Sequence, residues 1–328
     1  MRYVDVGGVR ISAIGLGTWQ FGAREWGYGD EYATGVAPAI VTRALELGIN
    51  LIDTAEMYGF GRSERIVGGA IRNHSRDDIF LATKVFPLVP IPPVVEWRAV
   101  ESAARLGADH LDLYQVHWPN PLFPIGTPMR AMAKLQAIGL VRNVGVSNFS
   151  LAQWQKADRA LGARVLSNQV QFSLAMRRHG DELASWAREN DRLVIAYSPL
   201  AQGLLSGRYD KNNLPANNVR RGNPLFLPEN LDRATELVGA LREVAIAHDA
   251  TCAQVALAWL IRRPNVVAIP GASSVAQVEA NAAAADLELS DDEDRQLTDA
   301  SDRFSPCIGR AATGSMLKRV VRMRRPSS

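Results

Sequence analysis

The sequence is poor in cysteine and has no long apolar run. Its 328 residues include two cysteines, Cys252 and Cys307, too few for a disulfide framework or a thiolate metal cluster. No stretch approaches the roughly 18 consecutive apolar residues of a membrane-spanning helix, and the start, MRYVDVGGVRIS, lacks the apolar run of a signal peptide. We therefore expect a soluble cytoplasmic protein with no metal site and no membrane association.

The charge of the chain is concentrated at its end. The formal net charge is +3, but the last thirteen residues, MLKRVVRMRRPSS, carry five Lys and Arg residues and no acid. Subtracting these five charges leaves −2 for residues 1–315, so the body of the chain is slightly acidic and does not indicate a nucleic-acid partner. We expect residues 316–328 to form a flexible, solvated tail; a tail that binds RNA or a membrane surface is the alternative.

Eight short apolar segments recur along the chain and predict β-strands. They begin near Ile14, Ile49, Ile79, Asp112, Arg142, Leu166, Arg192 and Asn265. Most are continuously apolar, as expected of parallel strands that are buried on both faces. Amphipathic segments between them predict helices: Ala39–Leu47, Val95–Leu106, Leu151–Leu161 after a Ser150 cap, and Leu183–Glu189. Each strand with its helix therefore fits a βα unit of about thirty residues.

Eight βα units predict a (β/α)₈ TIM barrel. A doubly wound open sheet is the rival, but the first turn reads GLGTWQFG and lacks the G-x-G-x-x-G fingerprint of that fold. Residues 2–12 predict an N-terminal hairpin that closes one end of the barrel. A long gap after the seventh strand holds the loop Gln202–Pro228 and the helical segments Leu231–Ala247 and Cys252–Arg263, and a last helix, Asp291–Ala300, follows a Ser290 cap. We expect residues 1–315 to form one domain.

Several of the predicted strands end in a reactive side chain. Asp53 ends the second strand, Lys84 the third and His117 the fourth, and Tyr58 follows Asp53 by five residues. Because barrel enzymes place their active sites at the C-terminal ends of the strands, these four groups should converge at one mouth.

The four groups together suit the reduction of a carbonyl without a metal. A phenol with a pKa of about 10 needs a nearby cation to ionise at neutral pH. Lys84 would supply that charge, and Asp53 would keep the ammonium charged and in place. With a hydride delivered to the carbonyl carbon, Tyr58 would protonate the oxygen while His117 donates a hydrogen bond to it.

In sequence order, these motifs resemble those of the aldo-keto reductases along essentially the whole barrel. The matching segments are Asp53-Thr-Ala-Glu-Met-Tyr58, Lys84, His117, Gly145-Val-Ser-Asn148, Gln169, Tyr197-Ser-Pro-Leu-Ala-Gln-Gly203 and Ile269-Pro-Gly-Ala. The resemblance implies that Asp53, Tyr58, Lys84 and His117 are the catalytic tetrad of an oxidoreductase. It also implies a small carbonyl substrate and a nicotinamide cofactor, usually NADPH.

The resemblance implies cofactor contacts at the ends of several strands. Those near the nicotinamide are Gly17, Thr18, Trp19, Asp53, Ser147, Asn148 and Gln169, with Tyr197 stacked on the ring. Those that fold over the pyrophosphate are Ser198, Pro199, Leu200, Gln202, Gly203, Ser206 and Tyr209. Those near the adenosine half are Pro270, Gly271, Ala272, Ser273, Gln277 and Asn281. The expected apolar wall of the substrate pocket is Trp19, Phe21, Met57, Phe86 and Trp118, although ordinary packing would explain each of these side chains equally well.

The adenosine segment departs from the usual pattern of the family. Many members place a lysine and an arginine where this chain has Gly271 and Gln277, and an acid where it has Ala280, although Glu279 is adjacent. Fewer fixed cations weaken the discrimination for the 2′-phosphate, so NADPH is the expected cofactor and NADH the alternative.

Two other functions are open at this point. The β subunits of voltage-gated potassium channels share the fold and these motifs, so a cofactor-binding regulatory protein with little turnover is one alternative. A Schiff-base enzyme with Lys84 as nucleophile is the other, but it needs a neutral amine that Asp53 would oppose. The physiological substrate depends on the loops Trp19–Tyr32, Phe86–Pro93, Trp118–Pro128 and Gln202–Pro228, and a single sequence gives neither their conformation nor the oligomeric state.

Overall fold

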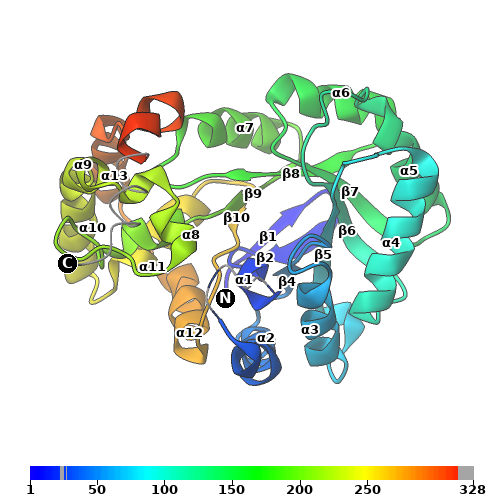
Figure 1. The fold of residues 1–328 in the computed structure, drawn as a ribbon, viewed down its shortest axis with the longest axis horizontal. Helices are drawn as coiled ribbons and strands as arrows, with labels where there is room; N and C mark the ends of the chain where they lie inside the picture. Colours follow the sequence, from blue (N-terminus) through cyan, green and yellow to red (C-terminus); the bar gives the residue numbers. More distant parts are fainter. Residues whose placement is uncertain (23–25, 27, 317–328) are drawn as a thin grey trace, which may run out of the picture.

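The computed structural model describes residues 1–22, 26 and 28–316. In this part of the chain eight parallel strands follow one another in sequence order, each paired with the next (Figure 1). They are β3 (Leu16–Gly17), β4 (Leu51–Asp53), β5 (Phe80–Val85), β6 (Leu111–Val116), β7 (Val141–Ser147), β8 (Val165–Gln171), β9 (Leu193–Tyr197) and β10 (Val266–Ala268). Each of the predicted apolar segments therefore forms its strand.

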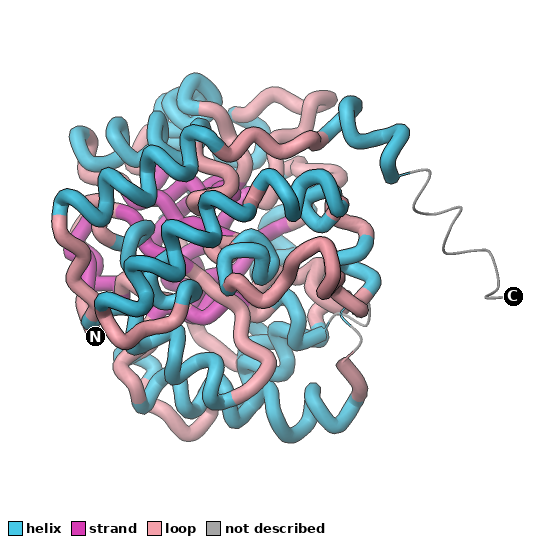
Figure 2. The backbone as a smooth tube through the Cα atoms, turned by 90° about the vertical axis from the view of Figure 1, so that its left-hand side faces the viewer, coloured by secondary structure: helices cyan, strands magenta, loops and turns pink. Residues whose placement is uncertain are grey.

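Helices surround the strands on the outside, and Figure 2 shows the strands in magenta enclosed by helices in cyan. Those between or after successive strands are α2 (Ala37–Glu46), α3 (Arg62–Ile71), α4 (Pro92–Leu106), α5 (Gly126–Ala137), α6 (Leu151–Leu161), α7 (Arg178–Glu189) and α12 (Val275–Ala283). The long segment after β9 contains η4 (Ala201–Ser206), α8 (Asn218–Arg221), η5 (Pro224–Phe226), α9 (Pro228–Arg233), α10 (Thr235–Ala247) and α11 (Cys252–Ile261). The remaining elements are α1 (Trp19–Gly22), η2 (Tyr32–Val36), η3 (Arg76–Asp78), η6 (Ala284–Asp286), α13 (Asp291–Arg303) and η7 (Gly309–Ala312).

The ring of strands is closed between its first and last members. The amide of Gly15 donates to the carbonyl of Ala268 at 2.8 Å. Gly17 permits the close approach, because a Cβ at this position would lie 2.7 Å from the carbonyl oxygen of Ile269. Figure 1 shows α12 beside α2 at this closure. The predicted (β/α)₈ barrel is confirmed.

Local sequence explains the helices that were predicted and those that were missed. Ser150 begins α6 in a capping box, as predicted, and Ser290 does the same for α13. The periodicity did not indicate α3, which contains the poor helix former Gly68. The tertiary packing needs that glycine, because a Cβ there would lie 2.6 Å from the carbonyl oxygen of Leu106 in α4. The predicted segment Leu231–Ala247 is divided into α9 and α10.

The barrel has a small core inside the strands and a larger core between the strands and the helices. The inner core consists of Val6, Ile11, Leu51, Phe80, Ala82, Leu113, Leu166, Leu193, Ile195, Val267 and Ile269. Two of these, Val6 and Ile11, belong to the hairpin of β1 (Tyr3–Val6) and β2 (Val9–Ser12). Their neighbours Leu51, Phe80 and Leu193 begin strands. The hairpin therefore closes the N-terminal end of the barrel, as predicted, and leaves the C-terminal end for the site.

Some predicted features fall on residues that the structure does not describe. Beyond residue 316 the predicted basic tail lies outside the described residues, as do residues 23–25 and 27 of the first predicted substrate loop. Within the described ranges no single helix has the length and apolar character to cross a membrane. Helices α10 and α11 reach the required length and apolar composition only when they are taken together, as a pair bent by 94°.

Candidate active site

Lys84 lies at the centre of the C-terminal end of the barrel. It is on β5, two residues after Ala82 of the inner core, so the alternation of the strand points its side chain inward. The ammonium donates to Asp53 Oδ1 at 2.6 Å, to the carbonyl of Thr54 at 2.8 Å and to the hydroxyl of Tyr58 at 3.3 Å. Burial alone would lower the pKa of Lys84, but Asp53 and Tyr58 outweigh it and the pKa is raised. Lys84 is therefore a fully protonated cation between an acid and a phenol.

Asp53 is held on its other side by amide side chains. Gln169 on β8 donates through Nε2 to Asp53 Oδ2 at 2.8 Å, and Gln115 on β6 approaches the same oxygen at 3.5 Å. The backbone carbonyl of Asp53 accepts from both the amide and the hydroxyl of Thr18. The resemblance assigns Gln169 to the nicotinamide, yet here its amide nitrogen is bonded to Asp53, which leaves the amide oxygen for a ligand.

Tyr58 lies on the loop that joins β4 to α3. Its amide donates to the carbonyl of Ala55 at 3.0 Å, and its own carbonyl accepts from the amide of Ser63 at the start of α3 at 3.2 Å. Burial raises the pKa of Tyr58 above its ordinary value; Lys84 lowers it and Asp53 raises it. Lys84 therefore acts in the expected direction, but burial outweighs it and the phenol stays protonated.

His117 completes the group at the end of β6. Its ring lies edge-on to Tyr58, with centroids 6.0 Å apart, and stacks on Trp118 at 3.8 Å with an interplanar angle of 9°. Burial first and the charge of Lys84 second lower the pKa of His117 to about 2. Its buried Nδ1 has no hydrogen-bond partner among the described residues. The imidazole is therefore neutral, which suits a hydrogen-bond donor rather than a proton source.

Polar groups extend from the tetrad toward β7 and β9. The amide nitrogen of Asn148 donates to the carbonyl of His117 at 3.1 Å and to the hydroxyl of Ser147 at 3.0 Å. Tyr197, at the end of β9, donates its hydroxyl to Asn148 Oδ1 at 2.9 Å. Asn148 has the left-handed φ of 62°, which an L-residue adopts at a cost and which is common at ligand sites. The structure therefore brings Ser147, Asn148 and Tyr197 together beside the tetrad.

The segment after β9 has an unusual backbone. Positive φ angles occur at Ser198, Ala201, Gln202, Gly203 and Gly207, and such clusters are typical of ligand clamps. Its predicted members Pro199, Leu200, Ser206 and Tyr209 lie along the same stretch.

Arg220 of α8 stabilises this stretch and was not predicted. Its Nε donates to the carbonyl of Gln202 at 2.7 Å, and its guanidinium lies over the rings of Trp26, at 5.4 Å, and Tyr209, at 5.8 Å. Local spacing gives no signal for these contacts, because Arg220 reaches Trp26, far away in the sequence between α1 and η2, and folds back onto Gln202 and Tyr209 of its own segment.

The end of β10 leads into the N-terminus of α12. Ala272 is buried, and its carbonyl accepts from Gln20 Nε2 at 2.8 Å and from the Tyr32 hydroxyl at 2.9 Å. Neither Gln20 nor Tyr32 was among the predicted cofactor contacts, although both lie in the predicted substrate loop Trp19–Tyr32. Ser273 and Gln277 bond each other through the Gln277 amide oxygen. The other predicted members of this segment are Pro270, Gly271 and the buried Asn281.

The carboxylate of Glu279 in α12 is already bonded to a protein side chain and is not available to a ligand. Its carboxylate accepts from Arg43 Nε of α2 at 2.8 Å, and the same guanidinium donates to Glu46 at 2.9 Å. This surface group therefore contains two acids and one base, and its net charge is negative.

Comparison with known proteins identifies the family. A sequence profile of the Aldo/keto reductase family matches residues 13–302. The chain belongs to this family. An uncharacterized oxidoreductase of Mycobacterium tuberculosis is 53% identical over 323 residues, which is 98% of each chain. A methylglyoxal reductase of Escherichia coli, YeaE, is 36% identical and covers 87% of this chain and 89% of its own length.

Solved structures agree with this assignment. An aldo/keto reductase from Klebsiella pneumoniae in complex with NADP and acetate superposes with a TM-score of 0.73 at 33% identity, covering 93% of this chain and 95% of its own. The likeness extends over nearly the whole chain, so the barrel described above is the aldo/keto reductase barrel.

The apolar residues predicted to wall the substrate pocket differ in their exposure. Trp19 and Trp118 are exposed, and Phe86 packs edge-on against Trp118 with centroids 5.7 Å apart. Met57 is half-buried beside the tetrad on the Tyr58 loop. Phe21 is 2% exposed and packs with Tyr32 in the outer core. The assignment of Phe21 to the substrate wall is therefore not supported, because the short helix α1 turns its ring inward.

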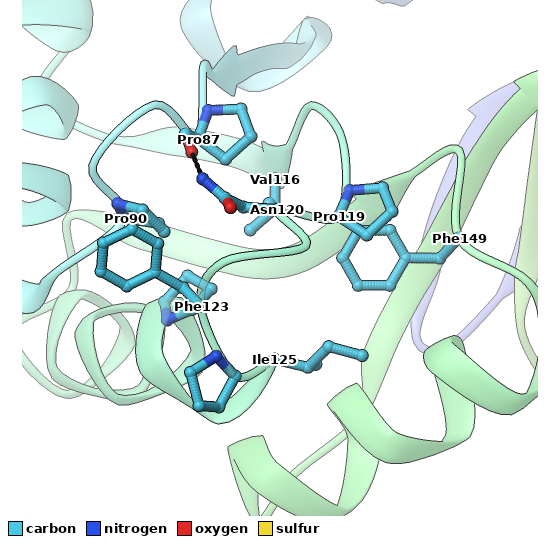
Figure 3. A pocket seen from close by; sticks show the side chains of 10 residues that line it. Pro87, Pro90, Val116, Pro119, Asn120, Phe123, Ile125 and Phe149 are labelled. Atoms are coloured by element: carbon cyan, nitrogen blue, oxygen red, sulfur yellow. Dashed lines mark hydrogen bonds between the residues drawn. The ribbon is translucent and has the colours of Figure 1, made fainter.

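A small hollow lies next to this aromatic rim. Figure 3 shows it between the loops after β5 and β6, with Phe149 on one side. Asn120 donates to the carbonyl of Pro87 at 2.7 Å across it. No member of the tetrad lines the hollow, which lies where the loops after β5 and β6 meet.

The structure also bears on Lys84 as a nucleophile. Burial by itself would favour the neutral amine that Schiff-base formation requires, but the bond to Asp53 outweighs burial and keeps the ammonium charged.

Proposed function

We propose that this chain reduces the carbonyl group of small aldehydes or ketones to alcohols with NADPH, with Tyr58 as the general acid. The observation that carries the proposal is the position of the Lys84 ammonium, which is bonded to both Asp53 and Tyr58 at the C-terminal end of the barrel. Methylglyoxal is the first substrate to test, because a relative 36% identical to this chain is a methylglyoxal reductase.

The residues beside the tetrad fit a nicotinamide dinucleotide. Asn148 and Gln169 offer amide groups and Tyr197 offers a half-buried ring. The left-handed stretch after β9 and the N-terminus of α12, capped by Ser274, offer backbone amides to a diphosphate. Arg220 adds a cation beside this stretch. When bound, the reduced cofactor supplies a hydride to the carbonyl carbon.

The tetrad would handle the proton and the charge on oxygen. The neutral His117 donates a hydrogen bond that orients the carbonyl oxygen and stabilises negative charge as it develops there. Tyr58 then transfers its proton to that oxygen. The charge of Lys84 stabilises the phenolate that Tyr58 becomes, and Asp53 keeps Lys84 protonated and aimed at the phenol.

NADPH is the proposed cofactor, with NADH as a weaker alternative. The Klebsiella pneumoniae relative was crystallised with NADP. In this chain the positions Gly271 and Gln277 carry no charge, and the nearby group of Arg43, Glu46 and Glu279 is negative. We therefore propose a preference for NADPH that is smaller than a site with two fixed cations would give.

The proposal is tested by following oxidation of NADPH, and separately of NADH, with methylglyoxal and a panel of aldehydes, and by identifying the product. The expected result is steady turnover with NADPH, formation of the alcohol, and a lower kcat/KM with NADH. Tight, stoichiometric NADPH binding with negligible turnover on the whole panel would instead support the regulatory alternative. Absence of binding to either nucleotide would contradict both.

A further inference from the structure

One buried carboxylate joins the loop of Tyr58 to the end of β5. Glu56 lies two residues before Tyr58, and its carboxylate accepts from the backbone amide of Phe86 and from Arg98 Nε, the latter at 2.8 Å. The amide of Glu56 donates to the carbonyl of Lys84 at 3.4 Å. Glu56 therefore connects the segment that carries the phenol to the segment that carries the ammonium.

Arg98 of α4 closes this connection into a ring. Its Nη1 donates to the carbonyl of Phe86 at 2.7 Å, while its Nε is bonded to Glu56. Both backbone polar groups of Phe86 are thus bonded to the Glu56–Arg98 pair. A guanidinium is suited to this task because it donates in two fixed directions at once, which an ammonium does not do.

Stability alone does not explain the Glu56–Arg98 ion pair, because burying two charges costs their hydration. The side chains of Arg98 and Glu56 are 21% and 7% exposed, and burial raises the pKa of Glu56, with the amide of Phe86 and Arg98 opposing it. Buried ion pairs are often no more stabilising than apolar residues of the same volume, and their clearest use is to specify one arrangement. Here the arrangement specified is that of two loops that meet at the tetrad.

We propose that Glu56 and Arg98 are positioning residues, which hold the Tyr58 loop against the end of β5 and so set the contact between the Tyr58 hydroxyl and the Lys84 ammonium. They also place the ring of Phe86 at the substrate rim. On the far side the loop of Phe86 is held by Asn120 through Pro87 (Figure 3). The inference rests on the proposed role of Tyr58 as the acid.

The test compares Arg98→Gln with a matched variant at the opposite end of the strands. Arg76 pairs with Asp112 at 2.5 Å, with exposed fractions of 22% and 6%, close to those of Arg98 and Glu56. Arg76→Gln therefore removes a comparably buried ion pair that contacts neither the Tyr58 loop nor Phe86, and it leaves Asp112 paired with Arg142 at 3.3 Å. We expect kcat for carbonyl reduction to fall by about 10²-fold in Arg98→Gln, with the Kd of NADPH nearly unchanged, and to stay near wild type in Arg76→Gln.

Arg98→Lys keeps the inference testable if Arg98→Gln does not fold. It retains the charge opposite Glu56 but not the second directed bond to Phe86, so kcat should be intermediate. Wild-type kcat in a folded Arg98→Gln or Arg98→Lys variant, or an equal loss in Arg76→Gln, would overturn the positioning role.

A crystal structure of the Arg98 variant separates this inference from the proposed function. If Tyr58→Phe retains turnover, the acid assignment is wrong, but the distance from Tyr58 Oη to Lys84 Nζ still reports on positioning. An increase from the 3.3 Å found here supports the inference, and an unchanged distance overturns it.

Discussion

The Lys84 ammonium donates to Asp53 Oδ1 at 2.6 Å, and the two side chains are 0% and 2% exposed. Two charges buried this completely lose their hydration, and each is stable only because the other is present. In the proposed mechanism the pair keeps Lys84 protonated next to Tyr58, so stability and activity should respond differently to its removal.

That difference can be measured with a double-mutant cycle. Lys84→Met leaves Asp53 buried without a cation, so the free energy of unfolding should fall by about 3–5 kcal/mol. Combining Asp53→Asn with Lys84→Met should recover most of that loss in urea unfolding, while carbonyl reduction stays abolished. A double variant that regains turnover would show that the pair has only a structural role.

The depressed pKa of His117 predicts an acid sensitivity of the fold. Its pKa is lowered from 6.5 to about 2, so as the pH falls below about 6.5 the unfolded chain takes up a proton that the folded chain does not. This group alone should lower the free energy of unfolding by about 2 kcal/mol between pH 7 and pH 5. His117→Gln should remove that part of the pH dependence in urea unfolding at the two pH values. An identical pH dependence in the variant would contradict the neutral assignment.

Tyr114 offers a substitution with the opposite effect on stability. Its side chain on β6 is completely buried, and its hydroxyl has no hydrogen-bond partner in the described part of the chain. Tyr114→Phe should therefore raise the free energy of unfolding by about 1 kcal/mol, because it removes an unsatisfied polar group. Turnover should not change. A destabilised variant would mean that this hydroxyl is satisfied in solution.

Arg220 should control how long the cofactor stays bound. Arg220→Leu removes the bond to the carbonyl of Gln202 and the contacts with the rings of Trp26 and Tyr209. A loss of about 1–2 kcal/mol corresponds to release of NADPH that is about tenfold faster, which stopped-flow fluorescence measures. Arg221→Leu, on the same helix, is the control, because Arg221 makes none of these three contacts. Equal release rates in the two variants would refute the role of Arg220.

The strands and most of the tetrad were accessible from sequence for a physical reason. Parallel strands that are buried on both faces have continuously apolar sequences, and the C-terminal ends of such strands meet at one mouth of a barrel. Locating the runs was therefore enough to bring Asp53, Lys84 and His117 together across separations of more than thirty residues.

The contacts and side-chain orientations that could not be predicted from the sequence depend on loop conformation. The bond from Gln20 to Ala272 spans 252 positions, and Arg220 joins the segment after β9 to Trp26, which lies far away in the sequence between α1 and η2. Gln169 was assigned to a ligand, but its amide nitrogen bonds Asp53 because β4 and β8 face each other inside the barrel. Phe21 lies between Gln20 and Gly22 in the sequence, and only the turn of α1 decides that its ring faces the core rather than the rim.

The proposed role of Tyr58 as the acid of a carbonyl reductase can be measured in a single-turnover oxidation of bound NADPH with saturating methylglyoxal. Tyr58→Phe should slow this step by about 10²- to 10⁴-fold while it binds NADPH as the wild type does. Tyr114→Phe, the matched removal of a phenolic hydroxyl, should react at the wild-type rate. A Tyr58→Phe variant that reacts as fast as Tyr114→Phe would contradict the claim.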